Sequence, residues 1–194
     1  LYNPLIWSAE VFGKSENSPQ NPRAIIIFVD MSDSANEARR TVCKEAFEKI
    51  YQNLRQGDRV VVGTITSRSY IEFKPTVDEE IPKKTVWDNR LQFEKKLANT
   101  KEKIRGETNK LLSRERGTAL TEILDSLNIA DTIFHEEKER QKILVLLSDM
   151  IEDSKGYNFD KDKITDEYID KVIRDRQKDK LIPNFTGVKV YVAG

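Results

Sequence analysis

A run of five apolar residues, 25–29 (IIIFV), constrains the fold more than any other stretch of this sequence. The run shows no alternation with polar side chains, which is the pattern of a central strand buried on both faces. Such a strand belongs to a sheet with helices on either side. The residues that follow it lie at the carboxyl edge of the sheet, where open α/β sheets bind their ligands.

A second apolar run, within residues 142–148, predicts another doubly buried strand. A helix of about twenty residues is expected between Ser34 and Gly57, because its apolar residues form one stripe. Further helices are expected at 91–116, 118–134 and 166–179, and further strands at 59–66, 70–73 and 187–193. The 70–73 strand would pair with 59–66 as a hairpin edge that ends at Pro75, and the 91–116 helix is either continuous or broken at Gly106.

This order of elements predicts an α/β fold: a Rossmann-like, open, mostly parallel sheet with one antiparallel edge strand and helices on both faces. Residues 23–194 are expected to form this one domain, since a chain of 194 residues has the length of a single domain. Residues 1–22 are interpreted as an N-terminal arm and a loop into the first strand.

Oxygen donors follow the first buried strand. Asp30 ends it, and Ser32 and Ser34 come at the next alternate positions. Carboxylate and hydroxyl oxygens without His or Cys suit Mg²⁺, Mn²⁺ or Ca²⁺ rather than zinc. The sequence therefore predicts a hard divalent cation at this edge.

The pattern Asp30-x-Ser32-x-Ser34 after an apolar strand resembles the opening motif of the von Willebrand factor type A family, with its metal ion-dependent adhesion site. That family needs a Thr in a later Gly-Thr loop and an Asp at the end of the fourth strand. Thr118 follows Gly117 at the start of a predicted helix, and Asp149 follows the strand in 142–148. The three parts of the motif thus occur in the family's order.

The resemblance implies a role for each residue. Ser32 and Ser34 would bind the cation directly, Thr118 would bind it directly or shift, and Asp30 and Asp149 would orient water molecules. Mg²⁺ is the expected ion, with Mn²⁺ and Ca²⁺ as alternatives. Because neutral hydroxyls compensate the cation's charge poorly, it attracts a further carboxylate. The expected partner is a protein that presents an Asp or a Glu.

Two features depart from the family's pattern. Met150 stands where the family usually has Gly after the Asp of the fourth strand, so the backbone of that loop is expected to differ. In the family, a further helix, a sixth strand and a last helix would follow Gly194. Because the sequence begins at Leu1 rather than Met, we expect a processed or shortened form. For location, an extracytoplasmic compartment is favoured over the cytoplasm.

The composition narrows the classes of function. Lys and Arg total 33 and Asp and Glu total 33, so no net charge favours nucleic acid or an anionic membrane surface. No apolar run approaches the roughly 18 residues of a membrane span, and direct membrane insertion is not expected. With one cysteine, Cys43, and one histidine, an internal disulfide and a Cys/His zinc site are excluded.

We therefore expect a metal-dependent protein-binding or adhesion module that is not an enzyme. Two alternatives stay open. One is a scaffold that uses the charged 91–116 helix as its contact, with a structural metal or none. The other is a Mg²⁺-dependent phosphate-handling enzyme that uses Asp30 and Asp149. The sequence has no P-loop or dinucleotide motif, and Ser32 stands where a haloacid dehalogenase-like phosphatase has its second Asp.

Overall fold

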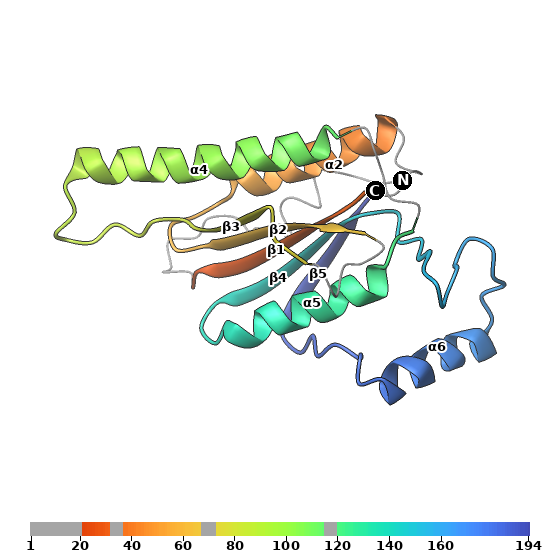
Figure 1. The fold of residues 1–194 in the computed structure, drawn as a ribbon. Helices are drawn as coiled ribbons and strands as arrows, with labels where there is room; N and C mark the ends of the chain where they lie inside the picture. Colours follow the sequence, from red (N-terminus) through yellow and green to blue (C-terminus); the bar gives the residue numbers. More distant parts are fainter. Residues whose placement is uncertain (1–20, 32–36, 67–72, 115–119) are drawn as a thin grey trace.

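The computed structural model describes residues 21–31, 37–66, 73–114 and 120–194. The helices and strands follow in the order β1 (Arg23–Asp30), α2 (Glu37–Gln52), β2 (Arg59–Ile65), β3 (Val77–Glu80), α4 (Arg90–Leu112), α5 (Ile123–Glu136), β4 (Gln141–Leu147), α6 (Asp166–Lys178) and β5 (Val188–Ala193) (Figure 1).

The strands form one five-stranded sheet in the order β3-β2-β1-β4-β5. All neighbouring pairs are parallel except β2 and β3, which are antiparallel. All eight residues of the central strand β1 are buried. The prediction of a mostly parallel, Rossmann-like α/β sheet with one antiparallel edge strand is therefore confirmed.

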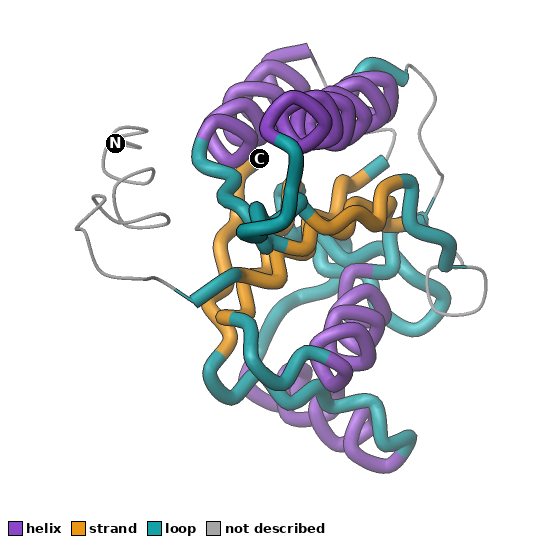
Figure 2. The backbone as a smooth tube through the Cα atoms, turned by 90° about the vertical axis from the view of Figure 1, so that its left-hand side faces the viewer, coloured by secondary structure: helices purple, strands orange, loops and turns teal. Residues whose placement is uncertain are grey.

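Helices cover both faces of the sheet. The packed side chains of α2 and α4 share one hydrophobic cluster with Ile25, Ile27 and Val29 of β1. Those of α5 share a second cluster with Ile26 and Phe28, which point to the other face. The two clusters correspond to the layers above and below the strands in Figures 1 and 2, where α6 lies farther from the sheet than α5.

The position predicted for the antiparallel edge strand was wrong. The strand is Val77–Glu80, which follows Pro75 instead of ending before it. Pairing begins directly after the proline, where the Thr76 N–H donates to the carbonyl oxygen of Val62 at 2.8 Å. Of the predicted 70–73 strand, residues 70–72 lie outside the described residues, and Phe73 lies in a loop where its ring packs edge-on against Phe28.

Two predicted helices also have different limits. Helix α4 runs through Gly106 without a break and begins at Arg90. The side chain of Asn89 caps it by accepting hydrogen bonds from the N–H groups of Leu91 and Gln92. Helix α5 begins at Ile123 rather than at residue 118. No helix among the residues that the structure describes is both long enough and apolar enough to cross a membrane.

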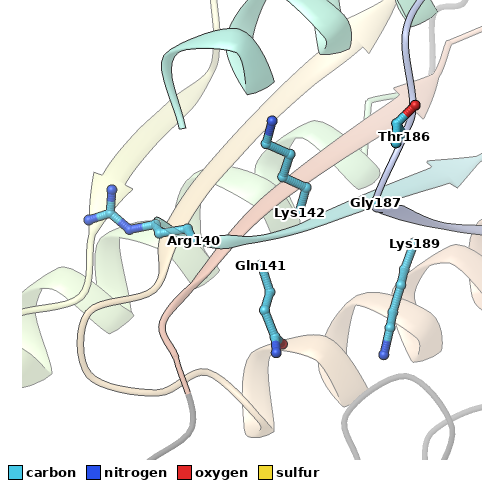
Figure 3. A pocket seen from close by; sticks show the side chains of 6 residues that line it. All are labelled: Arg140, Gln141, Lys142, Thr186, Gly187 and Lys189. Atoms are coloured by element: carbon cyan, nitrogen blue, oxygen red, sulfur yellow. The ribbon is translucent and has the colours of Figure 1, made fainter. Parts of the chain in front are cut away.

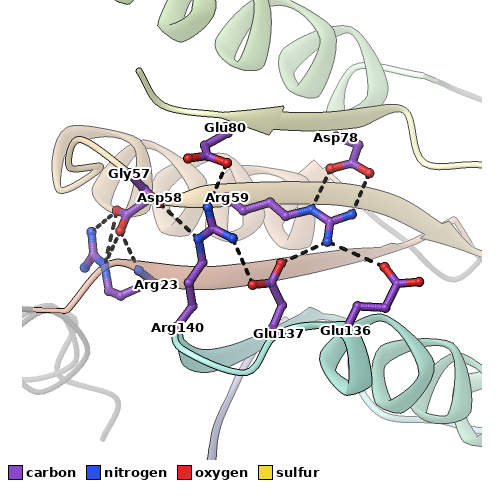
Figure 4. A network of polar contacts seen from close by, with 9 residues as sticks. All are labelled: Arg23, Gly57, Asp58, Arg59, Asp78, Glu80, Glu136, Glu137 and Arg140. Carbon is purple, nitrogen blue, oxygen red and sulfur yellow. Dashed lines mark hydrogen bonds and ion pairs between the residues drawn. The ribbon is translucent and has the colours of Figure 1, made fainter. Parts of the chain in front are cut away.

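Ion pairs tie the loops together at the amino edge of the sheet (Figure 4). The fully buried Asp58 accepts hydrogen bonds from the backbone N–H of Arg23 at 2.9 Å and from its Nε at 3.2 Å. Glu137, which is 6% exposed, accepts from Arg59 and from Arg140, both at 2.9 Å. These contacts fix the edge of the sheet opposite to the predicted metal site.

Candidate metal centre

The candidate centre lies at the carboxyl ends of β1 and β4, which are parallel neighbours. Val29 pairs with Leu147, so the next residues, Asp30 and Ser148, come side by side. The Ser148 hydroxyl donates to Oδ2 of Asp30 at 2.8 Å, and both residues are buried. Asp149 follows at once. The sheet therefore brings two carboxylates and one hydroxyl from two distant parts of the chain to one edge.

The loop after β4 is held by local hydrogen bonds. The Met150 N–H donates to the Ser148 hydroxyl at 3.0 Å, and the Ile151 N–H donates to Oδ1 of Asp149 at 3.1 Å. Met150 has a φ of 63°, in the left-handed region that glycine adopts most readily. The loop thus has the backbone conformation that suits Gly at this position, although the side chain is Met. The expectation that the backbone of this loop differs from the family's stays a prediction.

Arg39 is the charged neighbour of Asp149. It lies in the first turn of α2, and its guanidinium forms an ion pair with Oδ2 of Asp149. Both side chains are largely buried, with 17% and 14% of their surfaces exposed. Oδ2 of Asp149 has no hydrogen-bond partner among the described residues. Charge, rather than a directed hydrogen bond, therefore compensates this oxygen.

Cys43 lies one helical turn after Arg39, and its thiol faces the carbonyl oxygen of Ala193 at 3.9 Å. Burial raises the pKa of the Cys43 thiol to about 11, while the charge of Arg39 lowers it and that of Asp30 raises it. The thiol is therefore protonated at neutral pH. It is a buried side chain that packs between α2 and β5.

Glu152 connects the same loop to α5. Its buried carboxylate accepts a hydrogen bond from the Leu124 N–H at 3.0 Å, in the first turn of the helix. Burial raises the pKa of Glu152, and the hydrogen bonds from Leu124, Ser154 and Ile123 oppose the rise. Glu152 therefore holds the start of α5 against the loop after β4.

The segment just after Thr118 lies at this edge as well. The Thr121 N–H donates to the carbonyl oxygen of Asp153 at 2.6 Å, and the Asp153 N–H returns a bond of 3.0 Å. The Glu122 N–H reaches the carbonyl oxygen of Thr66, just beyond the carboxyl end of β2. Thr121 and Glu122, which lead into α5, are thus fixed beside the loop that carries Asp149.

The described residues include two of the five predicted metal ligands. Asp30 and Asp149 lie at one edge of the sheet, whereas Ser32, Ser34 and Thr118 lie outside the described residues. Within the described ranges, no group of three or more His, Cys, Asp or Glu side chains could hold a metal ion. The carboxylates of Asp30 and Asp149 are hard oxygen donors, so these two residues fit a hard cation. Oδ2 of Asp149 already faces the positive charge of Arg39.

Sequence reasoning missed two residues of this centre, Ser148 and Arg39. Ser148 had a visible signal, because it is the one polar residue between the apolar run and Asp149. Arg39 had none, since a charged residue in the first turn of a helix has the appearance of a solvated face. Its pairing with Asp149 depends on the packing of α2 beside the end of β4.

A pocket of about 350 Å³ lies at the opposite edge of the sheet, near the amino ends of β4 and β5 (Figure 3). Arg140, Lys142 and Lys189 line it, but Lys142 and Lys189 point in opposite directions. Arg140 is held by Glu137 and by the carbonyl oxygen of Gly57. The cations do not converge, so this pocket is a weaker candidate than the carboxyl edge.

The fold and this edge define an open, Rossmann-like α/β protein with carboxylates at the ends of its central strands. No protein-family model matches the chain, and a search of curated proteins gave no match. Among solved structures, it is similar to the pilus adhesin SpaC from Lactobacillus rhamnosus GG, with 20% identity and a TM-score of 0.40. The match covers 66% of this chain and 15% of the adhesin.

Proposed function

We propose that this chain is a protein-binding module of the von Willebrand factor A type. In this module a bound divalent cation engages an Asp or Glu of a partner protein, and Mg²⁺ is the first candidate for that cation. The observation that supports this proposal is the position of Asp30 and Asp149 at the ends of two parallel neighbours, connected through Ser148. The ends of central strands are the usual ligand sites of open α/β sheets.

Each residue of the centre has its own role in this proposal. Ser32, Ser34 and Thr118 supply neutral oxygens to the cation, and Asp30 and Asp149 hold its water molecules. Ser148 fixes the Asp30 carboxylate through the 2.8 Å hydrogen bond. When bound, the cation supplies positive charge that a partner's carboxylate completes. In this function the domain binds without catalysis.

The first test is calorimetric titration of the chain with Mg²⁺, Mn²⁺ and Ca²⁺. Wild type should bind one ion, and Asp30→Asn should lose most of the affinity because it removes one of two carboxylates without changing the side-chain shape. Asp160→Asn, at an exposed position, is the matched control and should bind as wild type does. Equal binding by wild type and Asp30→Asn would contradict the proposed centre.

The second test concerns the partner. A display library of random peptides, selected with Mg²⁺, should enrich sequences whose binding disappears with chelator and with Ala at one Asp or Glu. Ser32→Ala and Thr118→Ala should lose the same peptides while keeping their fold. Peptides that bind equally in chelator, and that are lost when the exposed Lys95 and Lys96 of α4 become Glu, would favour the scaffold alternative.

A further inference from the structure

The two carboxylates of the candidate centre are compensated in different ways. Asp30 accepts a hydrogen bond from the neutral hydroxyl of Ser148. Asp149 instead faces a full positive charge, because its Oδ2 forms the ion pair with Arg39. The Ser148 hydroxyl thus lies against Asp30, whereas a cation of the chain itself lies against Asp149.

This arrangement has an energetic reason. A carboxylate that is 14% exposed and lacks a hydrogen bond on one oxygen is costly to keep ionised. The guanidinium offsets this cost, since opposite charges in a partly buried position attract more strongly than in water. Oδ1 of Asp149 is occupied by the Ile151 N–H, so Oδ2 is the oxygen that remains for a positive charge.

A divalent cation whose water molecule is held by Asp149, as proposed above, would bring its positive charge close to the same carboxylate. The ion and the guanidinium would then lie within a few ångströms of each other. Like charges at that separation repel by an amount that corresponds to roughly a tenfold change in affinity even at the dielectric of water. Arg39 must therefore either leave Asp149 when the ion binds or weaken the binding. Arg39 lies in the first turn of α2, and 17% of its side chain is exposed to solvent.

We propose that Arg39 is a built-in counter-ion that competes with the divalent cation for Asp149 and so sets the metal affinity of the centre. This inference rests on the proposed function, because it assigns a residue that limits the affinity of that same site. It also explains how the metal-free domain keeps Asp149 buried: Arg39 occupies the position of positive charge until the ion displaces it.

The test compares Arg39→Gln with Lys44→Gln, which removes the same charge from an exposed position of α2. In calorimetry with Mg²⁺ and Mn²⁺, Arg39→Gln should bind about tenfold more tightly than wild type. Lys44→Gln should stay within about twofold, because its charge is far more screened by solvent. Arg39→Lys keeps the charge and should bind nearly as wild type does.

Thermal unfolding gives a second readout. Without metal, Arg39→Gln should have a lower Tm than wild type because Asp149 loses its counter-ion. Saturating Mn²⁺ should raise its Tm more than it raises that of wild type. If Arg39→Gln does not fold without metal, folding on addition of Mn²⁺ replaces the calorimetric comparison.

The outcomes separate the two ideas. Unchanged or weaker ion binding by Arg39→Gln, with normal binding by wild type, would overturn the role of Arg39 and leave the proposed function standing. Absence of ion binding in wild type and in Arg39→Gln alike would overturn the proposed metal centre, and the role of Arg39 with it.

Discussion

At the scale of single residues, the loop after β4 holds a non-glycine residue in a backbone conformation that glycine adopts most readily. Met150 has a φ of 63°, yet it is not glycine. The Met150 N–H compensates part of the cost by donating to the Ser148 hydroxyl, which in turn donates to Asp30. A strained residue thus completes the hydrogen-bond chain that fixes the candidate metal ligand.

Met150→Gly is expected to raise the free energy of unfolding by about 0.5 kcal/mol. It removes a left-handed strain of about 1 kcal/mol, and the extra freedom of glycine in the unfolded chain offsets part of this gain. Met150→Val should lower it by about 1 kcal/mol or more, since β-branched residues tolerate positive φ poorly. Urea denaturation of the three proteins measures both changes. A lower stability of Met150→Gly would show that the side chain's packing outweighs the strain.

Cys43 offers a second test at this scale, because it is the one cysteine in the sequence. Burial raises its pKa from 9.0 to about 11, so the thiolate fraction at pH 8 falls about a hundredfold. Alkylation by iodoacetamide should be at least that much slower in the native protein than in denaturant. Comparable rates in the two states would show that the thiol is exposed in solution.

At the scale of elements, tertiary hydrogen bonds decide where helices and strands begin. The periodicity of apolar residues predicts a helix from residue 118, but α5 starts at Ile123, where Glu152 accepts the Leu124 N–H. Likewise, β3 lies after Pro75, because Val77 is buried in the core and Asp78 pairs with Arg59 across the strands. Neither partner is close in sequence to the boundary that it sets.

The role of Glu152 predicts a specific pattern of stability. Glu152→Ala should lower the free energy of unfolding by about 1–3 kcal/mol, because the first turn of α5 loses a buried acceptor. Glu152→Gln keeps an acceptor oxygen and should cost less. Denaturation at pH 7 measures both. Equal losses for the two variants would show that the charge matters rather than the acceptor.

The direction of the pKa shift of Glu152 determines how its contribution to stability changes with pH. Burial raises the pKa of Glu152 in the folded state above its usual 4.5, so the folded protein holds its proton more tightly than the unfolded chain. The stability that comes from holding this proton is present below pH 4.5 and is lost as the pH rises through the folded pKa, while the hydrogen bond from Leu124 remains. Glu152→Gln should remove this trend.

At the scale of the whole molecule, the parallel sheet brings together residues far apart in sequence. Asp30 and Ser148 are 118 positions apart and form a hydrogen bond, because β1 and β4 run side by side in the same direction. The opposite edge is closed by the network around Glu137, Arg59 and Arg140. Ion pairs thus contribute at both edges, and at the carboxyl edge a hydroxyl–carboxylate hydrogen bond also joins the two strands.

The network at the amino edge should dominate acid sensitivity. Burial alone would raise the pKa of Glu137, but the hydrogen bonds from Arg59 and Arg140 hold it below its usual 4.5. A hydrogen bond from Arg59 lowers the pKa of Asp78 below 3.8. Both groups stabilise the fold above those usual values, and the stability is lost as the pH falls through the folded pKa values.

Glu137→Gln should therefore lower the free energy of unfolding by about 1–3 kcal/mol at pH 7, since charged hydrogen bonds are replaced by neutral ones. The difference from wild type should shrink as the pH falls through the lowered pKa of wild-type Glu137 and this carboxylate takes up a proton. Urea denaturation between pH 3 and pH 7 measures this. A difference that stays constant with pH would assign the loss to packing instead.

The sequence by itself determined the class of fold and the edge at which two candidate ligands lie. Apolar runs without alternation, at 25–29 and within 142–148, are clear signals of buried strands. Asp30 and Asp149 follow these two stretches directly. Both predictions depend on local patterns that burial imposes. The tertiary structure alone decided the edge strand, the start of α5, and the pairing of Asp149 with Arg39. These depend on which residues meet across the fold, and ion pairs between distant elements leave no periodic trace in the chain.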